Sequence, residues 1–220
     1  MPDRLTRYAP LTGVAAAVFL LVGVLSGTEP ADSSSSPAKV VHFYALHRSS
    51  IETTSVLIGI SLLLVVLFAT SLRAYLRRTE GGEGLSAMVL AGASISVTAG
   101  LLAVAVEYCL AHNLLKLTPS TVQAGNIVAQ EVFVPILGGV FLMTFATFLA
   151  ILRGAALPRW LGWLSLLVAV VAVIPPIGFA GFIGFVVWVV ITSIFMYLRI
   201  DAAAGEGAAS PPGPAPAQAG

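Results

Sequence analysis

The fold is decided by one long apolar stretch, Val122–Arg153, with the sequence VQAGNIVAQEVFVPILGGVFLMTFATFLAILR. Gln130 and Glu131 lie about two turns inside this stretch, as helical turns are counted. Pro135 cannot donate a backbone hydrogen bond, so the carbonyl of Glu131 loses its helical partner. We therefore predict a membrane-spanning helix with an interruption and a point of polarity, around which the other helices pack.

The composition of the whole chain is that of a membrane protein with several spans. Of its 220 residues, 58% are hydrophobic and 10% are charged, whereas soluble domains carry about 25% charged residues. The net charge of +1 provides no general attraction to nucleic acid, which we do not expect as a partner. The single cysteine, Cys109, excludes an intramolecular disulfide and a cysteine-based metal cluster.

Apolar runs separated by short polar segments predict an all-α fold, a polytopic bundle of six transmembrane helices plus a short interfacial amphipathic helix. The six spans are predicted at about residues 11–26, 51–76, 85–110, 122–152, 157–174 and 177–198, within a transmembrane domain 11–199. Residues 1–10 form a short N-terminus. Residues 200–220 are rich in alanine, glycine and proline, which predicts a disordered tail.

Residues 27–50 form the outer loop, the one sizeable loop of the prediction. Ser36 and Pro37 have the pattern of an N-cap followed by proline in the first helical turn. Apolar and polar residues alternate after them, which predicts a short amphipathic helix that lies at the interface and can run into the next span. A disordered loop is the alternative. The first span also has an alternative interpretation as a cleaved signal peptide, although Ser26-Gly27-Thr28 is a poor cleavage site.

Small residues mark the third span. Gly92, Ser96 and Gly100 recur every four residues, so they share one helical face. Because lipid provides no hydrophobic force between helices, such faces favour close backbone packing. We predict that this helix lies in the interior of the bundle.

Basic residues predict the orientation. Placing both termini in the cytoplasm puts eight cations inside, namely Arg4, Arg7, Arg73, Arg77, Arg78, Arg153, Arg159 and Arg199. Three then lie outside, namely Lys39, Arg48 and Lys116. The positive-inside rule favours this arrangement.

This orientation gathers polar side chains in the outer half of the bundle. We predict a candidate polar pocket there from seven residues: Glu131, Gln130, Asn126, Glu107, His112, Glu52 and His47. An ionised carboxylate at mid-membrane costs about 2.5–3.5 kcal/mol. We therefore predict that Glu131 faces the bundle interior, neutral or hydrogen-bonded, at the floor of this layer. The alternative is that these side chains only bond across helices and fix their packing.

Other chemistry has less support in the sequence. The set His47, Glu52, Glu107, His112 and Glu131 has ligand types suited to a metal, but its spacing matches no known site. Cys109 and His112 lie one turn apart with no third residue to orient them, so an enzyme is not favoured. We assign no cofactor, metal or catalytic residue.

Two segments carry a resemblance. The residues 30–33 (PADS) with 40–48 (VVHFYALHR), and the residues 157–164 (LPRWLGWL), resemble segments of an uncharacterised family of multi-pass membrane proteins in high-GC actinobacteria. The resemblance implies a six-helix protein of the bacterial inner membrane and gives no residue a role.

We expect a lipid-embedded protein that binds a small ligand, lipid or partner through the polar layer. A small transporter, including one formed by a homo-oligomer, is the alternative.

Overall fold

The computed structural model describes residues 8–28, 31–77, 82–154, 157–174 and 177–209, with side chains described up to residue 200. The elements are η1 (Ala9–Leu11), α2 (Thr12–Ser26), α3 (Pro37–Leu76), α4 (Gly82–His112), η2 (Leu114–Lys116), α5 (Pro119–Glu131), α6 (Phe133–Leu152), α7 (Arg159–Ala172) and α8 (Gly178–Ala209). No strand occurs in the described ranges. The predicted all-α bundle is confirmed.

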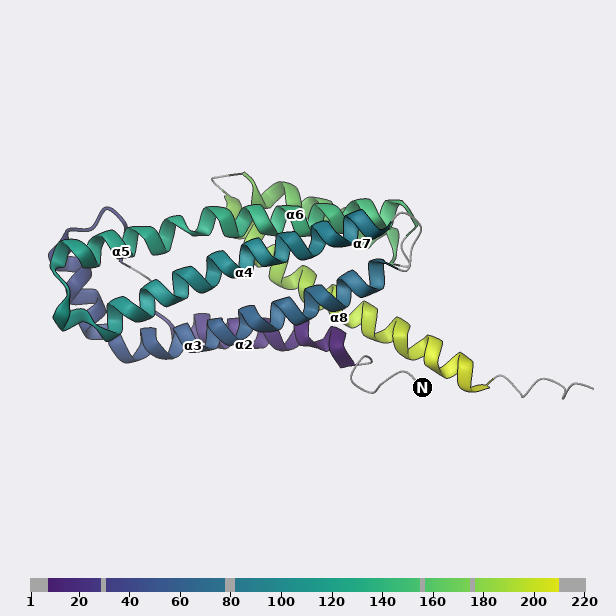
Figure 1. Ribbon diagram of the computed structural model, residues 1–220, viewed down its shortest axis with the longest axis horizontal. Helices are drawn as coiled ribbons and strands as arrows, with labels where there is room; N and C mark the ends of the chain where they lie inside the picture. Colours follow the sequence, from purple (N-terminus) through teal and green to yellow (C-terminus); the bar gives the residue numbers. More distant parts are fainter. Residues whose placement is uncertain (1–7, 29–30, 78–81, 155–156, 175–176, 210–220) are drawn as a thin grey trace, which may run out of the picture.

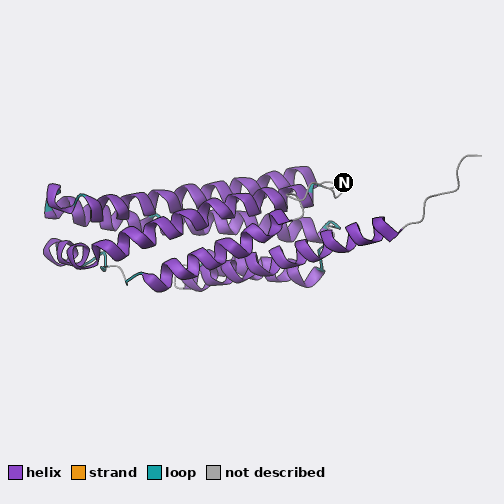
Figure 2. Cartoon of the chain, turned by 90° about the horizontal axis from the view of Figure 1, so that it is seen from below, coloured by secondary structure: helices purple, strands orange, loops and turns teal. Residues whose placement is uncertain are grey.

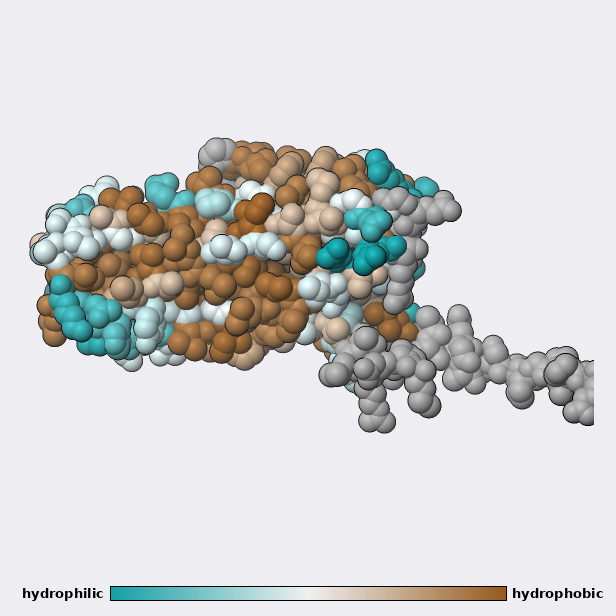
Figure 3. Space-filling model, viewed as in Figure 1, coloured by the Kyte–Doolittle hydropathy of each residue, from teal (hydrophilic) through white to brown (hydrophobic). Residues whose placement is uncertain are grey.

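Five helical segments are long and apolar enough to cross a membrane. They are Ala9–Ser26, Pro37–Leu76, Gly82–His112, Pro119–Leu152 and Gly178–Ile200. The sixth apolar helix, α7, has 14 residues and rises only about 21 Å at ~1.5 Å per residue. Hydrophobic residues cover most of the middle of the molecule's face in Figure 3. The chain is therefore an integral membrane protein.

The helices form a closed ring. Each of α2, α3, α4, α6, α7 and α8 packs against the next, and α8 returns to α2 (Figures 1 and 2). The α2–α8 contact is the least extensive of the six. The beginning and the end of the described chain lie at the same end of the ring, where the rings of Tyr8 and Tyr197 stack 6.1 Å apart.

The two ends of the bundle differ in charge and structure. At one end α3 and α6 finish and α7 begins, and this arginine end carries Arg77, Arg153, Arg159 and Arg199. At the opposite end, the cap end, lie η2, α5 and the first turns of α3. All three histidines, His42, His47 and His112, lie at the cap end.

The predicted amphipathic helix and the span after it are one helix of 40 residues, α3. The segment is therefore helical and runs into the next span, and it is not a disordered loop. In Figure 1 the first turns of α3, in indigo, run across the cap end, and in Figure 2 they are seen nearly end-on. Ser36 has the extended backbone of an N-cap, but its side chain makes no cap hydrogen bond.

The predicted interruption near Pro135 is present. The helix stops at Glu131, Val132 intervenes, and α6 begins at Phe133. Pro135 offers no N–H to the Glu131 carbonyl, so the hydrogen-bond ladder breaks one turn before the proline. On one side of the break α5 packs against α3 and α4 at the cap end, and on the other side α6 continues along the bundle.

The close packing predicted for the third span is confirmed between α4 and α6. A Cβ atom added at Gly92 would lie 2.6 Å from the backbone nitrogen of Met143. A Cβ atom at Gly139 would collide with the carbonyl of Gly92. The prediction that this helix lies in the interior of the bundle is wrong, because its opposite face is exposed at Met88, Ile95 and Leu102. The helix is a member of the ring and is not enclosed by it.

Some predictions fall outside the described residues. These are the N-terminal residues 1–7 with Arg4 and Arg7, the cation Arg78, and residues 210–220 of the predicted tail. α8 continues to Ala209, past the predicted end of the last span at residue 198.

Candidate functional site

The seven predicted pocket residues do not form one pocket. The structure divides them into a surface cluster around Glu52, a hydrogen-bonded face on α5, and Glu107 in a cavity. His47 joins none of the three; its ring lies 5.0 Å from that of Phe43, one turn earlier on α3.

The surface cluster ties α3 to the end of α4. Glu52 Oε1 accepts a hydrogen bond from Arg48 Nε and lies 3.2 Å from His112 Nδ1. The Arg48 guanidinium also donates to the backbone carbonyl of His112 at 3.2 Å. The His112 ring stacks on Tyr108, with ring centroids 5.6 Å apart. Exposed ion pairs of this kind contribute little to stability, so the cluster is a surface connection between helix ends.

The polar face of α5 holds the loop that precedes α3. Asn126 Nδ2 and Gln130 Nε2 both donate to the carbonyl of Ala31, at 3.0 and 2.6 Å. Gln123 Nε2 donates to the carbonyl of Ser35 at 3.0 Å. The Tyr44 hydroxyl donates to Asn126 Oδ1 at 3.3 Å, and Asn126 is only 2% exposed. For Asn126 and Gln130 the structure thus favours the packing alternative, because their donors are used by backbone carbonyls.

The prediction that Glu131 faces the interior is wrong. Glu131 is exposed at the last residue of α5. Successive helical residues point about 100° apart, so Gln130 turned toward the loop leaves Glu131 turned outward. The floor of the predicted polar layer is therefore not Glu131.

The remaining carboxylate, Glu107, lines a cavity of about 450 Å³ at the cap end. We call this space the cap cavity. Its walls come from the end of α2, the first half of α3, α4 and the start of α8. Thr28, Thr54 and Tyr44 also border it, and the hydroxyl of Thr54 donates to the carbonyl of Gly23 at 3.3 Å. Within the described part of the chain, Glu107 has no hydrogen-bond or ion-pair partner.

The cap cavity combines one acid with aromatic and aliphatic walls. The rings of Phe43, Tyr44 and Phe179 line it, and Glu107 is its one acidic side chain among the described residues. A carboxylate beside aromatic faces attracts a cation through charge and through the ring quadrupoles. Pockets that bind small molecules typically have volumes of about 300–1,000 Å³, apolar walls and few polar groups. The cap cavity has these properties.

The cap cavity opens on the side of the bundle, between α2 and α8. Two of its lining residues, Val24 and Phe179, are 57% and 66% exposed. Both lie on helices that cross the membrane, so the opening faces lipid more than water. A molecule with an apolar part can therefore reach Glu107 from within the bilayer.

The sequence pattern indicated Glu107 but not the rest of this wall. Tyr44 belongs to the segment predicted as amphipathic, and no motif distinguishes Thr54 or Phe179. The alternation of Phe43 and Tyr44 with polar residues was the available signal for an aromatic surface over the bundle. No pattern indicated that Phe179, at the start of α8, borders the same cavity as Thr54.

A metal centre has no support in the geometry. Among the described residues, no three His, Cys, Asp or Glu side chains gather as a metal-binding group. Glu52 and His112 meet, but Glu107 lines a separate cavity and Glu131 is exposed.

No family model, curated protein or solved structure matches this chain. The functional assignment therefore depends on the geometry of the cap cavity.

Proposed function

We propose that this integral membrane protein binds a small amphiphilic cation, such as an alkylammonium compound, in the cap cavity. The observation that carries the proposal is the Glu107 carboxylate, which is partly buried among aromatic rings and has no described protein partner. An ammonium group would supply the missing charge. The alkyl part would occupy the apolar opening between α2 and α8.

Burial strengthens this preference for a cation. Charge pairs attract more strongly near apolar protein than in water, by a factor of about four when the effective dielectric constant falls from ~80 to ~20. Anions would meet a like charge at Glu107 and are disfavoured. Neutral lipids would leave the carboxylate without a partner, at a desolvation cost.

The binding test uses hexyltrimethylammonium and the full chain in phosphatidylcholine nanodiscs, followed by isothermal titration calorimetry. Glu107→Gln keeps the shape of the side chain and removes its charge, so we expect at least about tenfold weaker binding, equal to ~1.4 kcal/mol. The matched control is Glu131→Gln, which removes an exposed carboxylate and should bind as the wild type does. Equal affinity of Glu107→Gln and the wild type would contradict the proposal.

We further propose that the arginine end faces the cytoplasm and the cap end faces outward, in a bacterial inner membrane. The distribution of cations supports this orientation through the positive-inside rule. The resemblance to an actinobacterial family supports the bacterial inner membrane as the location. Cys109 is the chain's single cysteine and is exposed near the cap end. A membrane-impermeant maleimide applied to intact cells should label Cys109. Labelling only after the cells are opened would reverse the orientation.

A further inference from the structure

Three cavities follow the same seam through the bundle, where α2, α3 and α8 meet. Beside the cap cavity there is a central cavity of about 50 Å³ and an arginine-end cavity of about 250 Å³. Each is bordered by α3, by α8, and by α2 or the η1 turn that precedes it. On α3 the border moves from Thr54 to Ser61 and then to Thr70. The cavities are therefore at successive depths along one line.

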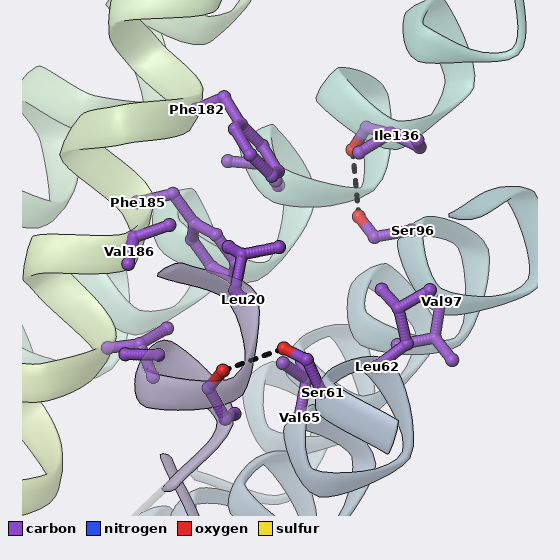
Figure 4. Close-up of a pocket in the computed structure, with 14 residues that line it drawn as sticks. Leu20, Ser61, Leu62, Val65, Ser96, Val97, Ile136, Phe182, Phe185 and Val186 are labelled. Atoms are coloured by element: carbon purple, nitrogen blue, oxygen red, sulfur yellow. Dashed lines mark hydrogen bonds between the residues drawn. The ribbon is translucent and has the colours of Figure 1, made fainter. Parts of the chain in front are cut away.

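The central cavity is a narrow apolar region between the two larger ones. Figure 4 shows Leu20 of α2 and Phe182 and Phe185 of α8 pointing into it. Its two hydroxyls are already used: Ser61 Oγ donates to the carbonyl of Ala16 at 2.7 Å, and Ser96 Oγ donates to that of Ile136 at 2.8 Å. A space of this size and polarity does not hold the proposed ligand at rest.

Below the central cavity, toward the arginine end, α2 and α8 touch at Gly13. A Cβ atom added there would collide with Ser193 Oγ and would lie 2.8 Å from Phe68 Cδ2 and 2.9 Å from Val189 Cγ1. These neighbours are all side-chain atoms. The constriction therefore depends on side-chain positions, which can change by rotation.

Two hydroxyls beside this constriction have no partner. Thr192 and Ser193 are both 0% exposed, and their oxygens make no hydrogen bond within the described residues. The buried hydroxyls of Thr147 and Ser165 bond to the carbonyl four residues earlier, at 2.8 and 2.7 Å, whereas Ser55 Oγ, nearer the cap end of α3, also has no partner among the described residues. A buried polar group without a partner is energetically unfavourable, because it has lost its hydrogen bonds to water. Contact with water or a passing ligand would remove this cost.

The helices of the seam are joined unequally. Three α3 hydroxyls, on Ser50, Thr54 and Ser61, donate to backbone carbonyls of α2. No hydrogen bond joins α2 to α8 in the described ranges, and their contact is the least extensive of the ring. Separation of α8 from α2 thus breaks no polar contact and exposes Thr192 and Ser193.

We propose that the α2–α3–α8 seam is a translocation path, which rests on the proposed binding function of the cap cavity. The amphiphilic cation bound at Glu107 passes the central cavity when α8 moves away from α2. It then reaches the arginine-end cavity, which is bordered by the hydroxyls of Thr70 and Ser71. The protein would accordingly carry alkylammonium cations across the membrane, down their gradient.

The test measures uptake of ¹⁴C-labelled hexyltrimethylammonium into phosphatidylcholine vesicles that contain the full chain. Leu20→Trp fills the central cavity and should lower the uptake rate at least about tenfold, a barrier increase of ~1.4 kcal/mol. Its matched control is Leu21→Trp, at the next position, where the side chain is 54% exposed. Leu21→Trp should leave uptake unchanged. Calorimetric binding by Leu20→Trp should remain that of the wild type, because the cap cavity is intact.

A second variant keeps the path testable if the tryptophan disturbs folding. Ser193→Ala removes only a hydroxyl and should lower uptake about threefold or more, a barrier increase of ~0.7 kcal/mol, with unchanged binding. Wild-type uptake rates in both Leu20→Trp and Ser193→Ala would overturn the path. Binding without uptake above that of protein-free vesicles would also overturn the path and leave the proposed function standing. Absence of binding would overturn the proposed function itself.

Discussion

The α4–α6 and α2–α8 contacts both join apolar membrane helices, but they pack in different ways. At α4–α6, glycines bring the two backbones together, with a Gly92 Cβ only 2.7 Å from the carbonyl oxygen of Gly139. At α2–α8 the close neighbours are side-chain atoms, and cavities lie on both sides of the contact. Backbone contacts cannot be relieved by rotation of a side chain, whereas contacts between side chains can. The bundle thus contains one fixed interface and one adjustable interface.

The largest effect is expected at the fixed interface. Gly92→Val places new atoms against backbone that cannot move without separating α4 from α6. We expect a loss of about 3 kcal/mol or more in the free energy of unfolding, the upper range for overpacking. Thermal unfolding in detergent, followed by size-exclusion chromatography of the folded fraction, measures it.

Gly138→Val is the matched control for this prediction. An added Cβ at Gly138 meets nothing within 4 Å, although Gly138 is next to Gly139 on α6. This variant should unfold within about 0.5 kcal/mol of the wild type. If both valine variants melt alike, backbone contact does not distinguish α4–α6 from the rest of the ring.

A smaller effect is expected at the adjustable interface. Gly13→Ala meets Ser193, Phe68 and Val189, whose side chains can rotate away. We expect a loss of about 1–2 kcal/mol in the free energy of unfolding, measured by thermal melting. Addition of Ser193→Ala removes one colliding atom and should recover part of the loss, as a double-mutant cycle would show. If Gly13→Ala costs as much as Gly92→Val, the α2–α8 contact is as rigid as α4–α6.

Local patterns were sufficient to predict the fixed interface. Glycine and serine at every fourth residue of the third span predicted the close approach that Gly92 makes. Pro135 likewise predicted the interruption that separates α5 from α6, since a missing N–H is a local property. Hydrophobic length predicted all the long spans and the fold class for the same reason.

The adjustable interface and the cavity beside it could not be predicted in this way. α2 and α8 are far apart in the chain, and no residue pattern records that Val24 and Phe179 border the same opening. Glu107 was found because a carboxylate in a span is conspicuous. Glu131 was found by the same signal, but its predicted direction was wrong. Gln130 and Glu131 are consecutive, and a rotation of about 100° separates the side of α5 that faces the loop from the side that faces outward.

A third prediction concerns the connection between the two interfaces at the cap end. Gln130 belongs to α5, which leads into α6, and it donates to the carbonyl of Ala31 in the loop after α2. Gln130→Ala removes this hydrogen bond, while Asn126 still donates to the same carbonyl. We expect a loss of about 1 kcal/mol in the free energy of unfolding, measured by thermal melting. The neighbouring Glu131→Gln, at an exposed position, should have almost no effect. Equal losses in the two variants would mean that the loop is not held by α5.

The smallest effect is expected from the turn that begins the same loop. Asp32 Oδ1 accepts hydrogen bonds from the backbone nitrogen and the hydroxyl of Ser34, at 2.7 and 2.8 Å. The backbone bond, followed by the hydroxyl bond, lowers the pKa of the Asp32 carboxyl below its ordinary value of 3.8.

A lowered folded-state pKa gives stability that is present above the unfolded-state value and is lost as the pH falls through the folded-state value. Asp32→Asn keeps an acceptor oxygen but removes the charge. The wild type should therefore melt slightly higher than Asp32→Asn at pH 6, and the difference should begin to shrink as the pH falls below about 3.8 and vanish below the folded-state pKa. Asp32 lies in the connection from α2 to α3, so acid should weaken this connection before it affects the α4–α6 interface. A melting difference that stays constant from pH 6 to pH 3 would show that the Asp32 charge does not stabilise this connection.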